Sequence, residues 1–499
     1  MALMIIFLNV HPLALNSDQQ SSRLSLFVRT ENMLDFQAFF NRTYFNVYQI
    51  ISTLNSTELR SAFSLAFVYV LRMLGLFMVM PVLAVSAQTY PDYSAFLVGL
   101  AIGGYGLTQA LLQIPMGVLS DKIGRKPVIV VGLIVFALGS FVAAQAESMT
   151  WIVVGRLLQG TGAIAGAIMA LAGDLSREEQ RPKVMAIIGI SIGFSFYLAL
   201  LIGPIISNQY GLSSIFLLTG SLAVFCILLV SFVVPNASNI APKGDTLPVA
   251  KDIKNLFSHP QLAKLNLSVL LLHMLITLLF VQLPVFLVDL NWPLAHHWQV
   301  YSIVLLASVV GLVVVMGLMG KYQSMLMQAC VFGLALVFGL MAFDHQSIIY
   351  LLVLVSLFFT CFNYLEANFP ALVSNIAPAG KKGSAMGIYA SCQFLGAFIG
   401  GLLSATLSEW LGISSVFVLA AILCVLWCYI IRGLSATTRL KRYTINVQTQ
   451  TASQAFQQLS ELEGVVDVTV VPNEQVVYLK TDSKHFDLKQ ARRVLNLQE

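Results

Sequence analysis

Glu366 is the residue best placed to do chemistry in this 499-residue sequence, because it is the only acidic residue well inside a long apolar stretch. Pro370 follows one turn later and could break a helix there. A carboxyl group in apolar surroundings holds its proton more readily than in water, so Glu366 could load and release a proton near neutral pH. The alternative is a structural ion pair with Arg72, another charge in an apolar stretch.

Arg72, Arg156 and His273 are the other groups that could take part in proton coupling. Arg72 is expected about 16 Å deep in its helix, where a charge is costly and usually faces a cavity. Arg156 is expected near the start of its helix, so its side chain could reach the surface or stay buried. His273 could titrate at about pH 6–7, although a histidine packed in the core is commoner.

A set of polar side chains lies at similar depth in other apolar stretches. These side chains could line a central substrate cavity, or they could join helices by hydrogen bonds. An aromatic cavity with few charges would suit a lipophilic or weakly polar substrate. The candidates are Tyr105, Gln109, Gln113, Tyr197, Gln282, Asn363, Tyr389 and Gln393.

Long apolar runs must position these residues, since 58% of the chain is hydrophobic and only 10% is charged. Soluble domains are about 45–50% apolar and about 25% charged, so the composition excludes an ordinary cytosolic enzyme, a disordered protein and a nucleic-acid binder. A membrane-spanning helix needs about 20 mostly apolar residues. Twelve such runs lie near 61–84, 95–119, 127–145, 151–173, 184–207, 213–234, 265–288, 298–319, 325–343, 347–374, 383–405 and 412–432.

Basic residues are confined to one set of the loops between these runs. That set holds Lys122, Arg125, Lys126, Arg177, Arg181, Lys183, Lys243, Lys251, Lys254, Lys264, Lys321, Lys381 and Lys382. The opposite set holds no lysine or arginine and instead carries the acidic residues Asp92, Glu147, Asp289, Asp344 and Glu409. Because basic loops stay in the cytoplasm, we expect both termini and the central loop on that side.

The composition also divides the chain into domains. The longest polar break, 235–264, is a predicted cytoplasmic linker between two six-helix bundles at 58–234 and 265–432. A shift of 201 positions places Asp174 and Arg181 on Asn375 and Lys382, which suggests that the two halves are repeats. Residues 1–57 have no sustained apolar run and are predicted to be a poorly ordered extension.

Residues 439–499 are predicted to form a small cytoplasmic domain, since the end of the chain alone has a soluble composition. The pattern is β-α-β-β-α, which is typical of a ferredoxin-like α+β module similar to heavy-metal-associated domains. No CxxC pair follows the first strand, and the six cysteines fall inside apolar runs, so neither a metal nor a cofactor is expected. Regulation, ion sensing and self-association remain open as roles for this domain.

The loop after the second run, from Gly117 to Lys126, reads GVLSDKIGRK and resembles the signature loop of the major facilitator superfamily. The resemblance implies a latch that holds the two halves together on the cytoplasmic side, whereas the alternative is that these charges only set topology. Glycines permit close packing and a tight turn, and an acid can face a helix N-terminus. The latch candidates are Gly117, Asp121, Gly124, Arg125, Lys126 and, as the partner of Arg125, Asp174.

Other segments resemble the same superfamily, namely RMLGLFMVMPVL from Arg72, YGLTQALLQIP from Tyr105 and GRLLQGTG from Gly155. Gly193, Gly203 and Pro204 resemble the antiporter motif of drug:proton exchangers, although Ser207 and Asn208 stand where two glycines are expected. With the soluble tail, residues 60–499 resemble the YajR group of bacterial inner-membrane transporters. That resemblance implies twelve helices, a cytoplasmic ferredoxin-like domain and a place among drug:proton antiporters.

We therefore expect a secondary active exporter in which two helical halves rock about a central site and an entering proton drives efflux. Glu366 would carry the proton, Arg72 and Arg156 would tune it, and the latch would hold the outward-open state. The alternatives are a nutrient uptake symporter or facilitator, and a membrane sensor that signals through its tail. An enzyme is not expected, because the sequence has no nucleophile–base set, metal set or P-loop. The expected partners are a small molecule, protons and the lipid bilayer, without nucleic acid.

Overall fold

The computed structural model describes residues 54–177, 180–236, 255–317, 323–343, 347–378, 381–432, 434, 440–446, 452–471, 476–482 and 486–494. The predicted N-terminal extension lies outside these residues except for its last four positions. Most of the predicted linker at 235–264 also lies outside them.

Twelve helical segments in the described part of the chain are long and apolar enough to cross a membrane, as the sequence predicted. Those of the first half are α3 (Ser56–Met78), α5 (Ala95–Ile123), α6 (Arg125–Ala144), α7 (Met149–Thr161) followed by α8 (Ala165–Asp174), α9 (Arg181–Tyr210), and α10 (Leu212–Leu228) followed by η2 (Leu229–Val233). Those of the second half are α13 (Pro260–Asp289), α14 (His297–Gly317), α15 (Gln323–Met341), α16 (Ile348–Ile376), α17 (Lys382–Leu411) and α18 (Ile413–Ile431). The short helices α4 (Leu83–Ser86), η1 (Ala87–Thr89) and η3 (Leu294–His296) connect longer ones.

Three details of these helices differ from expectation. The first helix begins at Ser56, because Asn55 and Glu58 form a capping box, so Arg72 lies sixteen residues into it rather than eleven. Pro370 does not break α16, which continues to Ile376. The fourth span is instead interrupted between α7 and α8, at residues 162–164.

The two halves meet closely along α5 and α17. A Cβ atom added to Gly99 would lie 2.5 Å from the carbonyl oxygen of Gly401, and one added to Gly106 would lie 2.5 Å from that of Phe394. Real Cβ atoms do not approach backbone so closely, so glycine at these positions permits the two helices to touch.

An aromatic layer also joins the halves. Phe196 of α9 packs against Phe77 of α3, and across the interface against Phe280 of α13 and Phe359 of α16, with ring centroids 5.1–6.2 Å apart. Edge-to-face and tilted ring pairs of this kind contribute about 0.5–1.5 kcal/mol each beyond their buried area. We call these four phenylalanines the aromatic layer.

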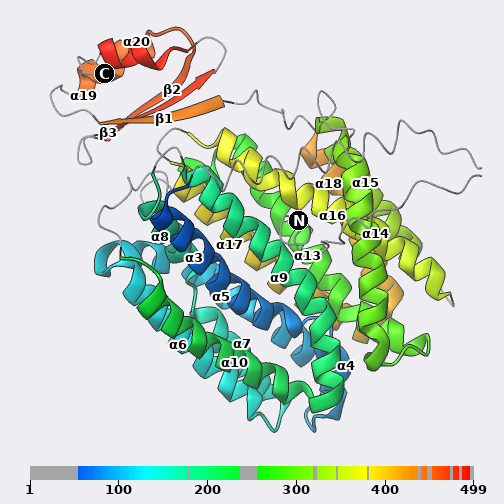
Figure 1. Cartoon of the computed structure of the whole chain (residues 1–499). Helices are drawn as coiled ribbons and strands as arrows, with labels where there is room; N and C mark the ends of the chain where they lie inside the picture. Colours follow the sequence, from blue (N-terminus) through cyan, green and yellow to red (C-terminus); the bar gives the residue numbers. More distant parts are fainter. Residues whose placement is uncertain are drawn as a thin grey trace, which may run out of the picture.

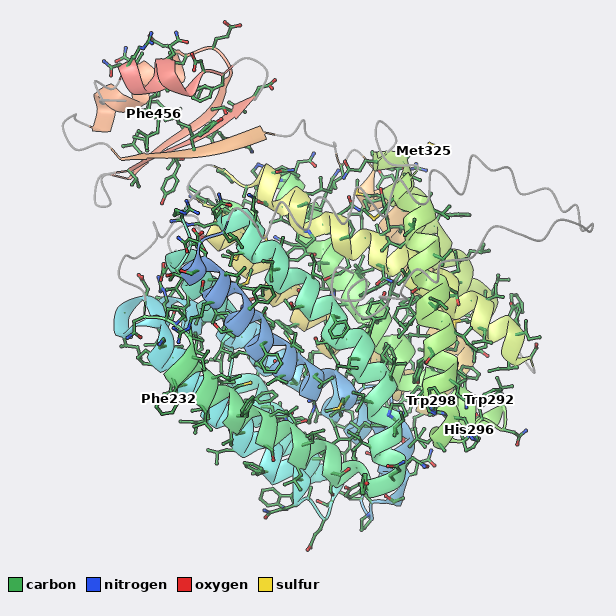
Figure 2. The ribbon with its side chains drawn as sticks, viewed as in Figure 1. Phe232, Trp292, His296, Trp298, Met325 and Phe456 are labelled. Atoms are coloured by element: carbon green, nitrogen blue, oxygen red, sulfur yellow. The ribbon has the colours of Figure 1, made fainter. Side chains whose placement is uncertain are left out.

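The bundle has two chemically different ends. One end, which we call the basic end, carries the helix termini with Lys122, Arg125, Arg181 and Lys382, and the C-terminal domain lies beside it (Figure 1). The other, the tryptophan end, carries Trp151, Trp292, Trp298 and Trp410 near helix termini. Figure 2 shows Trp292 and Trp298 at the end away from the C-terminal domain and Met325 at the end beside it. Tryptophan is enriched at membrane–water interfaces, so this end lies at one such interface.

The C-terminal domain has the predicted order of elements, namely β1 (Leu440–Asn446), α19 (Ala452–Ser460), β2 (Val465–Val471), β3 (Val476–Asp482) and α20 (Leu488–Val494). Its antiparallel sheet has the order β1-β3-β2. Val477 and Leu479 of the central strand pack with Leu459 of α19 and Ala491 of α20, so one face of the sheet forms the domain core under its helices.

Candidate functional site

Glu366, His273 and Gln393 come together at one depth in the second half, and we call them the Glu366 cluster. Glu366 lies ten residues before the end of α16, His273 thirteen residues after the start of α13, and Gln393 eleven residues after the start of α17. At about 1.5 Å per residue, all three lie about 15–20 Å from the basic end. Three helices of one half therefore place a carboxyl, an imidazole and an amide at the middle of the span.

Gln393 lies between the two titratable groups. Its Nε2 is 2.6 Å from His273 Nε2 and 3.4 Å from Glu366 Oε1, while His273 Nδ1 is 3.2 Å from the Val269 carbonyl oxygen. A neutral imidazole fits this arrangement, since Nδ1–H then donates to Val269 and Nε2 accepts from the Gln393 amide. The amide thus connects the acid to the base.

Glu366 is both accessible and incompletely satisfied. Its side chain is 34% exposed and its Oε2 atom lies 3.8 Å from His273 Nε2, which is too long for a hydrogen bond. That oxygen is buried and has no hydrogen-bond partner among the described residues. Leaving a buried acceptor unpaired is costly, and a proton on this oxygen would turn it into a donor.

Arg72 does not pair with Glu366, so that alternative from the sequence is wrong. Its Nη2 atom instead donates to the Tyr105 hydroxyl at 2.9 Å and to the Gly162 carbonyl oxygen at 3.1 Å, both within the first half. The Gly162 carbonyl is available because the helix is interrupted there. Arg72 is 1% exposed, and its guanidinium also lies 5.4 Å from the centre of the Phe136 ring.

Arg156 is likewise buried, rather than reaching the surface. Its Nε donates to the Ala101 carbonyl and its Nη1 to Gln159 Oε1, both at 2.9 Å, and it lies over the Tyr105 ring. The sequence analysis did not predict Gln159 as the acceptor for Arg156, although residues three apart lie on one helix face. Both arginines thus contact Tyr105 within the first half.

The predicted cavity residues divide into three groups. Tyr105, Gln109 and Gln113 form a buried hydrogen-bonded chain along α5, with Tyr105 donating to Gln109 at 3.1 Å and Gln109 to Gln113 at 2.8 Å. Gln282 binds Ser404 within the second half. Tyr105 and Gln109 also bind Arg72 of α3, and Gln282 joins α13 to α17, whereas the bond printed for Gln113 stays within α5.

The remaining cavity candidates lie near the interface between the halves. Asn363 donates to the Tyr197 hydroxyl at 2.7 Å, which is a direct bond from α16 to α9. Tyr389 lies one turn before Gln393 on α17, and its buried hydroxyl has no hydrogen-bond partner among the described residues. Gln393 therefore contacts Glu366, Asn363 and Tyr389 lie within one turn of these two residues on α16 and α17, and Tyr197 is bonded to Asn363. The aromatic layer was not predicted; its members Phe280 and Phe359 lie seven residues from His273 on α13 and from Glu366 on α16.

The predicted latch residues are brought together at the basic end. Arg125 Nε donates to Asp174 Oδ2 at 2.9 Å, and its Nη2 lies 3.5 Å from Asp121 Oδ1. Lys126 donates to the Val234 carbonyl, and Gly124 has φ +99° between α5 and α6, where a glycine is favoured. Gly117 Cα lies near Gly166 of α8. These contacts brace helices α5, α6 and α8 within the first half.

The antiporter-like motif has two different surroundings. A Cβ atom on Gly203 would lie 2.7 Å from the Met78 carbonyl oxygen, so this glycine lets α9 pack on the end of α3. Pro204 follows inside α9, which continues to Tyr210. Gly193 is exposed, and nothing lies within 4 Å of an added Cβ.

In the described part of the chain, no three metal-ligating side chains come together.

Comparison with known proteins gives the same fold. The family model described as Major Facilitator Superfamily matches residues 65–401 and 361–463. The chain is 40% identical over 445 residues to the inner membrane transport protein YajR of Escherichia coli strain K12, which covers 87% of this chain and 98% of that protein. A match at 34% identity to multidrug resistance protein D of the same organism covers 22% of this chain and 28% of that protein. The crystal structure of the nucleoside transporter NupG superposes with a TM-score of 0.61 at 15% identity, covering 76% of this chain and 99% of that one.

Proposed function

Because the chain belongs to the major facilitator superfamily, and is thus a multi-pass membrane transporter and not an enzyme, we propose that it is a proton-coupled exporter. The substrate is a small, lipophilic or weakly polar molecule, and the membrane is the inner membrane of a bacterium. The basic end faces the cytoplasm, since positively charged loops are retained there. The observation that carries the proposal is the Glu366 cluster, where an accessible carboxyl and an imidazole share one amide.

The Glu366 cluster handles the proton. Glu366 takes up a proton on Oε2, the oxygen that lacks a hydrogen-bond partner, and releases it when the halves exchange access. When His273 Nε2 gains a proton it becomes a donor, so Gln393 must present its oxygen instead of its nitrogen. This flip of the Gln393 side-chain amide also changes the hydrogen bond between Gln393 and Glu366. Protonation of His273 is thereby coupled to Glu366.

The aromatic layer sets the direction from which Glu366 is reached. Phe280 and Phe359 each lie seven residues, or about 10 Å, toward the tryptophan end from His273 and Glu366. The close contact of Gly99 with Gly401 lies on that same side. The exposed part of Glu366 therefore opens toward the basic end in this conformation, which corresponds to an inward-facing state. Tyr197, Asn363 and Tyr389 line the substrate site beside it.

The first-half arginines and the latch have separate parts in this proposal. Arg72 and Arg156 hold Tyr105 in place, and Arg72 also holds the interrupted fourth span, so these arginines act by positioning the first half and not by contact with the proton site. Arg125, Asp174 and Asp121 stiffen the basic end of the first half, so that it can close as a unit against the second half in the outward-open state.

Direction of transport is the first test. A thermal-shift screen on the purified protein would supply a substrate, and its flux would be followed in everted membrane vesicles with an acidic interior. An exporter accumulates the substrate in these vesicles, and an ionophore that collapses the pH gradient stops accumulation. Accumulation only in right-side-out vesicles would instead establish uptake. Glu409→Gln, an exposed acid at the tryptophan end of α17, is the matched control for Glu366→Gln in both preparations.

A further inference from the structure

Lys480 of the C-terminal domain contacts the end of the helix that carries Glu366. Its Nζ atom lies 3.3 Å from the carbonyl oxygen of Ile376 and 3.5 Å from that of Ala377, the last residue of α16 and its C-cap. The last carbonyls of a helix lack intrahelical donors and carry partial negative charge, so a lysine ammonium there is favourable. Lys480 is only 7% exposed, which marks an enclosed contact rather than a surface side chain.

The face of the sheet that carries Lys480 is itself covered. Successive residues of a strand point to opposite faces, so Val476, Tyr478 and Lys480 share the face opposite to Val477 and Leu479. The domain's own helices cover the latter face. An antiparallel sheet with helices on one side normally exposes its other side, yet Val476 and Tyr478 are only 4% and 2% exposed. Figure 1 shows the sheet between its own helices and the basic end of the bundle.

We propose that the face of the sheet that carries Val476, Tyr478 and Lys480 is a docking surface for the membrane bundle itself. The Lys480 ammonium then lies on the end of α16. Docking restrains the basic end of the helix whose Glu366 lies ten residues, or about 15 Å, away. The C-terminal domain therefore favours the conformation described here, and it must release or follow α16 when the halves rearrange. This inference rests on the proposed movement of the halves but not on proton coupling or on the direction of transport.

Docking is measured by the distance between two spin labels in the full chain. Phe456 of α19 and Met325 of α15 are exposed and lie on the domain and on the basic end of the bundle (Figure 2). Cysteines at these two positions carry the labels, in a background where the half-buried Cys392 and Cys428 are alanine. The docked domain gives one narrow distance distribution. Lys480→Met broadens it, while Lys480→Arg and the exposed-site control Arg493→Met leave it narrow. A broad distribution in the unsubstituted chain, or no change with Lys480→Met, overturns the proposal.

Hydrogen exchange separates release of the domain from its unfolding. With Lys480→Met, amide exchange rises about tenfold or more in residues 373–377, while amides of α19 and β2 keep their protection. If the substitution unfolds the domain, exchange rises in α19 and β2 as well, and the distance distribution of the unsubstituted chain decides the question. Because neither measurement needs a transported substrate, failure of docking is distinguishable from failure of the proposed export. In vesicles, release of the restraint raises the initial transport rate severalfold, and an unchanged rate would show that docking does not act on α16 movement.

Discussion

Arg72 donates from Nη2 to the carbonyl oxygen of Gly162 at 3.1 Å, where the fourth span is interrupted between α7 and α8. A backbone carbonyl freed inside a membrane must find a donor, because no water is present at that depth to serve it. The buried guanidinium therefore has a structural task in the first half, and the sequence expectation of a direct role beside Glu366 gives way to this one.

Arg72→Lys tests that task. Lysine keeps the charge but offers a compact ammonium that cannot serve the Tyr105 hydroxyl and the Gly162 carbonyl together from the same position. We expect a lower thermal unfolding midpoint in detergent, corresponding to about 1–3 kcal/mol for each buried group left unpaired. Arg432→Lys, at an exposed position after α18, should leave the midpoint unchanged. Equal midpoints for the two variants would show that the Gly162 carbonyl does not depend on Arg72.

Asp92 links the loop before α5 to the start of α7, and this link depends on pH. Desolvation raises the pKa of Asp92, but hydrogen bonds from Thr150 and from the Met149 amide outweigh it and hold that pKa below its ordinary value. A carboxyl whose pKa is lowered by folding stabilises the fold above its unfolded pKa, and the contribution is lost as pH falls through the folded value. The thermal midpoint of Asp92→Ala should lie below that of the unsubstituted chain at neutral pH, and the gap should close below about pH 4.

The control for Asp92 is Glu147→Ala, since Glu147 is an exposed acid at the same end of the bundle. It should show no pH-dependent gap. A gap for Asp92→Ala that stays constant down to strongly acidic pH would mean that the carboxylate charge does not contribute.

Asp174 and Asp121 both contact Arg125, but unequally. Asp174 is 2.9 Å away and 1% exposed, whereas Asp121 is 3.5 Å away and 17% exposed. Asp174→Asn should therefore weaken closure of the basic end more than Asp121→Asn. The measurement is thiol labelling of a cysteine at Gly193, which lies in open space on α9, with Asp289→Asn at the tryptophan end as the control. Labelling rates that are equal in all three variants would remove the proposed latch.

Gly99 tests closure at the opposite end. Alanine there would place a Cβ atom 2.5 Å from the Gly401 carbonyl oxygen, so α5 and α17 must separate. We expect Gly99→Ala to shift the protein toward conformations that are open at the tryptophan end, seen as a longer distance between spin labels at that end of the two halves. Gly189→Ala should have no effect, because nothing lies within 4 Å of its added Cβ. An unchanged distance for Gly99→Ala would contradict the closed contact.

The sequence predicts features that depend on short segments of the chain, and it does not predict features that depend on packing between helices. The twelve spans and the partnership of Arg125 with Asp174 follow from hydropathy, charge and motif spacing, which are properties of short segments. The interrupted fourth span was not predicted; at this break Ile164 lies against Gly132 of α6, a contact between helices that hydropathy along the chain does not report.

The same limit applies to the connections across helices. Gln393 joins His273 to Glu366 only because three helices of one half converge at equal depth. Lys480 is an ordinary surface lysine in the sequence, and its contact with Ile376 depends on where the whole domain docks. Gln282 looked like a cavity residue because its type suits one, whereas the structure gives it Ser404 as a partner.

The most direct test of the account is proton movement in proteoliposomes that hold a pH-sensitive dye, driven by a gradient of the substrate found by thermal shift. The unsubstituted protein and Glu409→Gln should move protons against the substrate. Glu366→Gln should move none, yet should still exchange labelled for unlabelled substrate across the membrane, because the halves can rearrange without the carboxyl proton. Substrate-driven proton movement by Glu366→Gln at the unsubstituted rate would contradict the claim that Glu366 carries the proton.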